Sequence, residues 1–89
     1  MGAALEHHTR SLDIRERLAG ADPDNPHYQR DVAVSAYKVA GVLESVGDAS
    51  AIDYWSKTHQ VLAALNAARK LPDGDRQFLD YVRHKLDAR

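Results

Sequence analysis

Three short breaks rich in glycine, proline and aspartate constrain this chain more than any other feature. They span residues 20–26, 47–50 and 71–75. Glycine and proline interrupt regular structure, because glycine frees the backbone and proline lacks the amide hydrogen that a helix or sheet needs. Four segments contain no internal proline, and they cover about 3–19, 26–46, 50–70 and 75–87. Each segment is therefore free to form one continuous element.

In all four segments, mostly apolar side chains recur every three or four residues, which is the spacing of one face of an α-helix. The first two faces carry Ala4, Leu5, His8, Ser11, Leu12, Arg15 and Leu18, and then Tyr28, Val32, Ser35, Val39, Val42, Leu43 and Val46. The last two faces carry Ala51, Ile52, Trp55, Thr58, Leu62 and Leu65, and then Phe78, Leu79, Val82 and Leu86. We therefore predict four helices, each with one buried face.

The ends of these helices have local signals. Asn25 is suited to cap the second helix, because its side chain can accept hydrogen bonds from free backbone amides. Gly20 and Gly47 are expected to end the first and second helices, since glycine adopts the left-handed conformation that follows many helices. Asp48 or Ser50 is expected to cap the third helix.

The chain is long enough for one small domain, with 89 residues and a mass of 9.9 kDa. A chain of this length buries about 60–65% of the surface that its unfolded form exposes, so a large enclosed active site is not expected. The connections between the segments are short, which favours antiparallel neighbouring helices. The sequence thus predicts an all-α fold of about four helices arranged as antiparallel hairpins.

Composition argues against several classes of function. The 12 basic and 13 acidic residues leave a net charge of −1, so the chain offers no strongly basic surface to nucleic acid or anionic lipid. No apolar run approaches the roughly 20 residues of a membrane span. The chain has no cysteine, which excludes disulfides and favours a reducing, cytoplasmic location. We expect neither a nucleic-acid nor a membrane partner.

The residues that could carry catalysis or bind a metal form no recognisable set. His7 and His8 are adjacent and point to different faces of a helix, unlike metal ligands spaced one turn apart. Ser11 lies near His8, but a mid-helix serine has neither the strained turn nor the oxyanion hole of a nucleophile. Asp73 and Asp75 lack the spacing of a calcium loop and are better suited to helix capping. We therefore predict no enzyme activity, no cofactor and no metal.

Three stretches of the chain follow one another in a recognisable order. Residues 11–18 are Ser-Leu-Asp-Ile-Arg-Glu-Arg-Leu, residues 21–25 are Ala-Asp-Pro-Asp-Asn, and residues 28–32 are Tyr-Gln-Arg-Asp-Val. Together they resemble the tetratricopeptide repeat, a helical hairpin that stacks in arrays, in its long bacterial variety with an extended loop between repeats. The resemblance covers about residues 3–66. Tyr28 stands where tryptophan is usual in that variety, and Val-Ala at residues 39–40 replaces a Leu-Gly pair.

The resemblance implies a division of the chain into three parts. Residues 1–20 would be the second helix of an incomplete repeat, residues 25–71 one helix–turn–helix repeat, and residues 72–89 a capping helix. A repeat does not bury its apolar face alone, so we expect this chain to be the C-terminal end of a longer array. The candidate interface with an adjoining repeat, or with a second copy of the chain, consists of Leu5, His8 and Leu12.

The resemblance also implies a binding groove, because such arrays line a concave surface with the first helix of each repeat. Transferred by register, the groove residues here are Val34, Tyr37, Lys38, Gly41, Glu44 and Ser45. They lie off the predicted core stripe, which supports the assignment. We therefore expect a protein-interaction module or scaffold segment that binds a peptide or helix. A chaperone tail is not the expected partner, because Tyr37 and Gly41 occupy positions where the carboxylate-clamp variety has lysine and asparagine.

Two other roles stay open at this point. The chain could be a structural or regulatory C-terminal cap of a larger signalling protein, without a ligand of its own. It could also be a helical domain that forms homodimers through residues 1–20.

Overall fold

The computed structural model describes residues 2–88 and is built from helices. They are α1 (Gly2–Ala21), α2 (Pro26–Ser45), α3 (Ala51–Ala67) and α4 (Arg76–Asp87), with one 3₁₀ turn, η1 (Asp73–Asp75), before α4. The described residues contain no strand. The predicted all-α fold of four helices is therefore confirmed.

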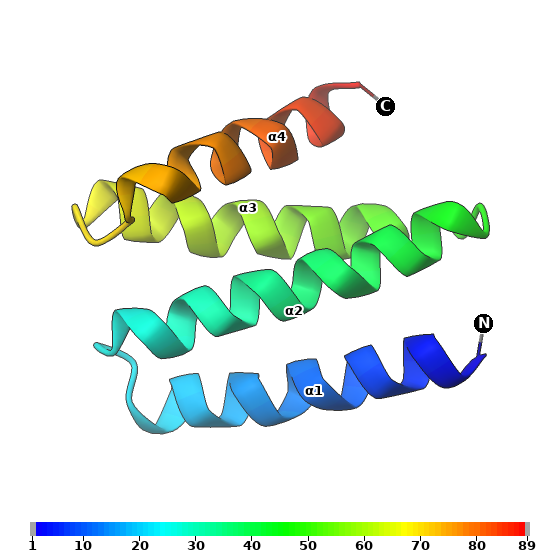
Figure 1. Ribbon diagram of the computed structural model, residues 1–89, viewed down its shortest axis with the longest axis horizontal. Coiled ribbons are helices and arrows are strands. Elements are labelled where there is room, and N and C mark those ends of the chain that lie inside the picture. The colour runs from blue at the N-terminus through cyan, green and yellow to red at the C-terminus, as the bar shows by residue number, and fades with distance from the viewer. Residues whose placement is uncertain (1, 89) are drawn as a thin grey trace.

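Successive helices run in opposite directions and lie side by side in the order α1, α2, α3, α4 (Figure 1). α1 packs against α2, α2 against α3, and α3 against α4. Because the direction alternates, α2 and α4 run parallel to each other, and so do α1 and α3 (Figure 1). None of the helices is both long enough and apolar enough to cross a membrane, within the part of the chain that the structure describes.

Local signals place the ends of α2 as the sequence predicts. The side chain of Asn25 accepts hydrogen bonds from the backbone amides of His27 (2.9 Å) and Tyr28 (3.3 Å). Pro26 occupies the first turn, where its missing amide hydrogen costs nothing. At the other end, Gly47 has a φ of +72°, the left-handed conformation that a residue with a side chain rarely adopts. The predicted cap and stop are both confirmed.

The prediction that Gly20 ends α1 is wrong. The helix continues through Gly20 to Ala21, and the amide of Asp22 still donates to the carbonyl of Leu18 (3.1 Å). A glycine inside a helix costs only about 1 kcal/mol relative to alanine. That cost is too small to end a helix whose neighbours favour it.

The start of α3 depends on Asp48, not on a cap by Ser50. Oδ1 of Asp48 accepts hydrogen bonds from the hydroxyl (2.7 Å) and the backbone amide (2.9 Å) of Ser50, whereas the Ser50 side chain caps no amide. These two bonds hold the pKa of the Asp48 carboxyl below its usual value. α3 ends at Ala67, inside the segment of residues 50–70, and Arg69 follows with a φ of +60°.

α2 forms the centre of the hydrophobic core. Ala33, Ala36, Val39 and Ala40 are at most 1% exposed, and their small size lets the neighbouring helices approach closely. The other helices contribute the buried side chains Leu12, Ala19, Ala51, Trp55, Leu62, Leu79 and Val82.

Three residues of the predicted faces are exposed to solvent. Ala4, Leu18 and Val46 are exposed, the last two at 44% and 52%. On α1 the buried face is continued by Ala19, seven residues after Leu12, because seven residues make almost two full turns. Val46 follows the last residue of α2 and has left its helical face.

Trp55 is the largest side chain of the core, and it is 3% exposed. We expect Trp55→Ala to lower the free energy of unfolding by about 3–5 kcal/mol, because it leaves a cavity between three helices. Urea denaturation followed by circular dichroism measures this loss. Ser56→Ala, at the exposed neighbouring position of α3, should change stability by no more than about 0.5 kcal/mol. Similar losses in both variants would contradict the central position of Trp55.

Candidate functional site

Side chains of α2 meet η1 and α4 at three levels, beginning with an ion pair to η1. Arg30 of α2 donates from Nε to Oδ2 of Asp75 (2.5 Å) and from Nη2 to Oδ1 (3.1 Å). Asp75 is 8% exposed, and such burial of a carboxylate is tolerated when a guanidinium pairs with both oxygens. The hydrogen bond to Asp75 raises the pKa of Arg30 above its usual value, although desolvation opposes it.

This ion pair corrects the sequence-based role of Asp75. The residue precedes α4, but its side chain makes no capping hydrogen bond there. Its carboxylate is directed instead to Arg30, which lies 45 residues away in the chain. No local pattern signals a partner at that distance, so the sequence analysis did not predict this pair.

The second level is aromatic and is centred on Tyr37 of α2. The Tyr37 ring packs edge to face against Trp55 of α3 and against Phe78 and Tyr81 of α4, with centroids 5.6, 5.2 and 6.2 Å apart. Each such pair contributes about 0.5–1.5 kcal/mol beyond its buried area. Tyr37 keeps 37% of its surface exposed, so the same ring stabilises the fold and faces solvent.

The third level is formed by Glu44 of α2 and Lys85 of α4. Nζ of Lys85 donates to Oε2 of Glu44 (2.8 Å), and this bond raises the pKa of Lys85. The same ammonium lies 5.6 Å from the ring centre of Trp55 and 5.7 Å from that of Tyr81, within reach of a cation–π interaction. The α2 residues of the three levels are seven positions apart, or about two helical turns.

A hollow of about 330 Å³ opens beside the second and third levels. Five of the six predicted groove residues line it: Tyr37, Lys38, Gly41, Glu44 and Ser45. Trp55 and Tyr81 border it from α3 and α4. The sixth predicted residue, Val34, lines a neighbouring hollow between α1 and α2, which Lys38 also borders. We call the first hollow the groove.

The groove combines three chemical features. The rings of Tyr37 and Tyr81 are partly exposed and present apolar surface. Lys38 is exposed and has no ion-pair partner among residues 2–88. At Gly41 an added Cβ would meet no atom within 4 Å, so the surface there is open. This arrangement can hold an apolar side chain beside an acidic or hydrogen-bonding group.

The three residues of the candidate interface on α1 have different environments. Leu12 is 3% exposed and belongs to the core. Leu5 is half-buried against the same core, and His8 lines the groove. Among the described side chains of α1, the large apolar ones that are exposed are Ile14 (52%) and Leu18 (44%), one helical turn apart. If α1 has an outer partner, these two residues and not Leu12 are placed to meet it.

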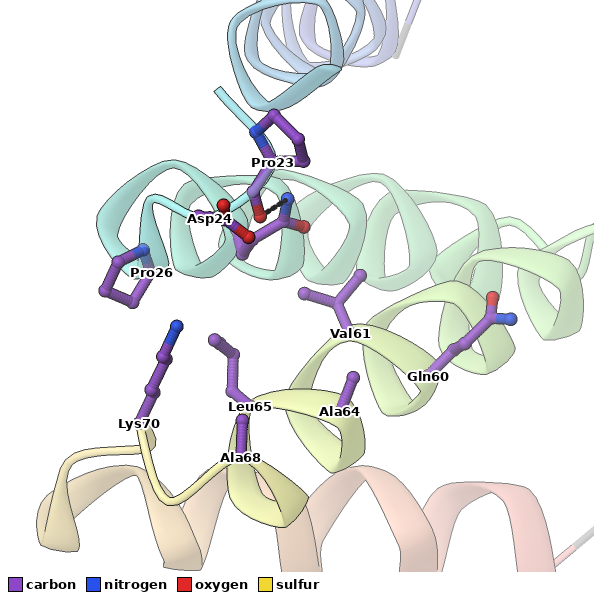
Figure 2. A pocket seen from close by; sticks show the side chains of 10 residues that line it. Pro23, Asp24, Pro26, Gln60, Val61, Ala64, Leu65, Ala68 and Lys70 are labelled. Atoms are coloured by element: carbon purple, nitrogen blue, oxygen red, sulfur yellow. Dashed lines mark hydrogen bonds between the residues drawn. The ribbon is translucent and has the colours of Figure 1, made fainter. Parts of the chain in front are cut away.

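A further hollow of about 360 Å³ lies where the start of α2 faces the end of α3 (Figure 2). Val61, Ala64 and Leu65 of α3 form its apolar floor. Gln29, another lining residue, donates to the carbonyl of Pro23 (3.3 Å), which orders the loop at its rim. The sequence analysis did not predict this hollow, because it arises where two segments about 40 residues apart meet. Asp24, Gln29, Gln60 and Lys70 supply the polar part of its lining.

The described residues include no group of three or more histidine, aspartate and glutamate side chains that could hold a metal ion. Oγ of Ser11 accepts a hydrogen bond from Nε of Arg15 (3.4 Å). The predictions that the chain is not an enzyme and has no cofactor stay predictions.

Comparison of the chain with protein-family models, with curated protein sequences and with solved structures found no match. The resemblance to tetratricopeptide repeats therefore stays a prediction from the sequence.

The Arg30–Asp75 pair can be tested through stability. We expect Asp75→Asn to lower the free energy of unfolding by about 1–3 kcal/mol, because Arg30 loses its charged acceptor at a nearly buried position. Asp73→Asn is a matched control, since the Asp73 side chain is fully exposed two residues earlier. Urea denaturation of both variants measures the difference. Equal stability of the two variants would contradict the importance of the pair.

Proposed function

We propose that this chain is a protein-interaction module whose groove binds an extended segment of a partner protein. The observation that carries the proposal is the clustering of five predicted groove residues around one hollow. Those residues were transferred by register from the resemblance to tetratricopeptide repeats, and they come from a single helix. Their common hollow also includes side chains of α3 and α4, which the register did not specify.

The packing of the helices supports the tetratricopeptide-like part of this proposal. In a stack of helical hairpins, each helix meets both its own partner and the equivalent helix of the next hairpin. Here α2 and α4 run parallel, and side chains of α2 meet η1 and α4 at three levels. The parallel helices α1 and α3 are joined by an ion pair between Glu16 and Lys57 (2.7 Å). Equivalent helices are thus linked on both sides of the molecule.

The chemistry of the groove supports a peptide ligand. Tyrosine and tryptophan supply large contact areas at low cost in side-chain entropy, and they are enriched where proteins bind one another. Lys38 can meet an acidic side chain or a carbonyl without breaking an existing ion pair. Gly41 lets a peptide backbone approach the helix closely.

Selection from a displayed peptide library on the full chain tests the proposal. We expect enriched peptides whose binding is weakened at least tenfold by Gly41→Gln, because the new side chain fills the open part of the groove. The substitution should not harm the fold, since glutamine favours a helix more than glycine does. Gly20→Gln is the matched control, because Gly20 is also helical and also has no atom near an added Cβ.

A second pair of variants tests the charge of the groove. Lys38→Glu should weaken the same peptides, whereas Lys70→Glu, outside the groove, should not. Failure to select any peptide, or equal weakening by the groove and control variants, would contradict the proposed function.

A second candidate function is association through α1, and the exposure of Ile14 and Leu18 favours it. We expect light scattering to show a mass above 9.9 kDa that falls on dilution. The double substitution Ile14→Lys and Leu18→Lys should leave a monomer at every concentration, because it places charge on both apolar contacts. Val46→Lys, at an equally exposed apolar position after α2, should not alter the mass. A wild-type chain that is monomeric throughout the dilution series would contradict this function.

A further inference from the structure

The hollow between α1 and α2 is lined chiefly by hydrogen-bond donors. It has a volume of about 200 Å³ and adjoins the groove, with which it shares His8 and Lys38. Three cationic side chains line it, from Arg15, Arg30 and Lys38. A single carboxylate, that of Asp31, belongs to the same lining.

The charges around this hollow do not balance. Oδ2 of Asp31 lies 3.4 Å from Nη1 of Arg15, and Arg30 is paired with Asp75. Lys38 has no carboxylate partner within the described residues. Three cations therefore meet two carboxylates, and one positive charge remains.

Two hydroxyl groups that line this hollow also have no acceptor for their O–H among the described residues. Oγ of Ser11 accepts a hydrogen bond from Nε of Arg15, which leaves the Ser11 O–H free to donate. Ser35 is 5% exposed, and its side chain has no hydrogen-bond partner in the part of the chain that the structure describes. This hydroxyl borders the hollow, so its O–H is available to donate to a ligand that accepts a hydrogen bond.

We propose that this hollow binds an oxyanion, the chemical group shared by carboxylates and phosphates. Lys38 supplies the unbalanced charge, Arg15 supplies a guanidinium held in place by Ser11, and the hydroxyls of Ser11 and Ser35 donate hydrogen bonds. Since the hollow adjoins the groove, an acidic or phosphorylated side chain of a groove peptide would place its oxyanion here. This last step rests on the proposed function, whereas binding of the oxyanion does not.

Titration of the full chain with inorganic phosphate, and separately with acetate, tests the proposal by nuclear magnetic resonance at constant ionic strength. We expect saturable shifts of the backbone amides of Ser11, Ser35 and Lys38. Saturation by both anions indicates a general oxyanion site, and saturation by phosphate alone indicates a site for phosphorylated groups. Either outcome supports the proposal.

Charge-removing variants separate this site from general attraction of anions. Arg15→Gln and Lys38→Gln should each raise the dissociation constant about tenfold, since each removes a charged donor. Arg83→Gln, which removes an exposed arginine of α4 with an acidic neighbour, should leave it unchanged. Circular dichroism confirms that the variants are folded. Absence of saturation with both anions, or equal weakening by Arg83→Gln and Arg15→Gln, would overturn the proposal.

One further variant separates the two proposals. Gly41→Gln fills the groove but does not line the hollow between α1 and α2, so it should leave phosphate binding intact. If phosphate binds at the hollow while no groove peptide is found, the oxyanion site stands and the proposed function fails. If groove peptides bind while neither anion saturates the hollow, the proposed function stands and the oxyanion site fails.

Discussion

The placement of α4 beside α2 depends on the ion pair between Arg30 and Asp75. α4 packs on α3, and side chains carry its connection to α2. Of these, the Arg30–Asp75 pair lies where α4 begins, so it fixes the point along α2 at which α4 starts. Arginine is suited to this position, because its planar guanidinium meets both oxygens of a carboxylate and fixes their direction. With Asp75 held by Arg30 and α4 packed on α3, Tyr81 and Lys85 of α4 reach Tyr37 and Glu44 of α2.

α2 contributes to two surfaces, the hydrophobic core and the groove, and different residues of the helix form each one. Ala33, Ala36 and Ala40 face the core, where small side chains allow close packing. Tyr37 and Gly41 come one position after two of these alanines, which turns them by about 100° to the border of the core. The same helix therefore fixes the fold through one side and forms the groove through the adjacent side.

Local signals predicted the helices, whereas contacts between distant residues escaped prediction. The Asn25 cap and the Gly47 stop depend on residues beside them, so the sequence was sufficient. The partner of Arg30 depends on how α4 is placed against α2, which no nearby residue encodes. Register predicted five groove residues, because residues of one helix face stay together wherever the helix packs. Val34 was separated from them because it lies about one turn earlier, where α1 borders α2.

The groove residues fall into two groups with different freedom to bind a ligand. Tyr37 and Glu44 line the groove, yet they also hold α4 in place, so a ligand that draws either side chain away weakens the link between the helices. Lys38 and Gly41 do not hold α4 in place, since Lys38 has no ion-pair partner among the described residues and Gly41 has no side chain. Under the proposed function, a ligand therefore gains most when it stacks on the fixed tyrosine ring and places its polar group at Lys38. Selectivity should accordingly reside in the unpaired lysine and the open glycine, while the aromatic contacts supply a rigid surface that many sequences can use.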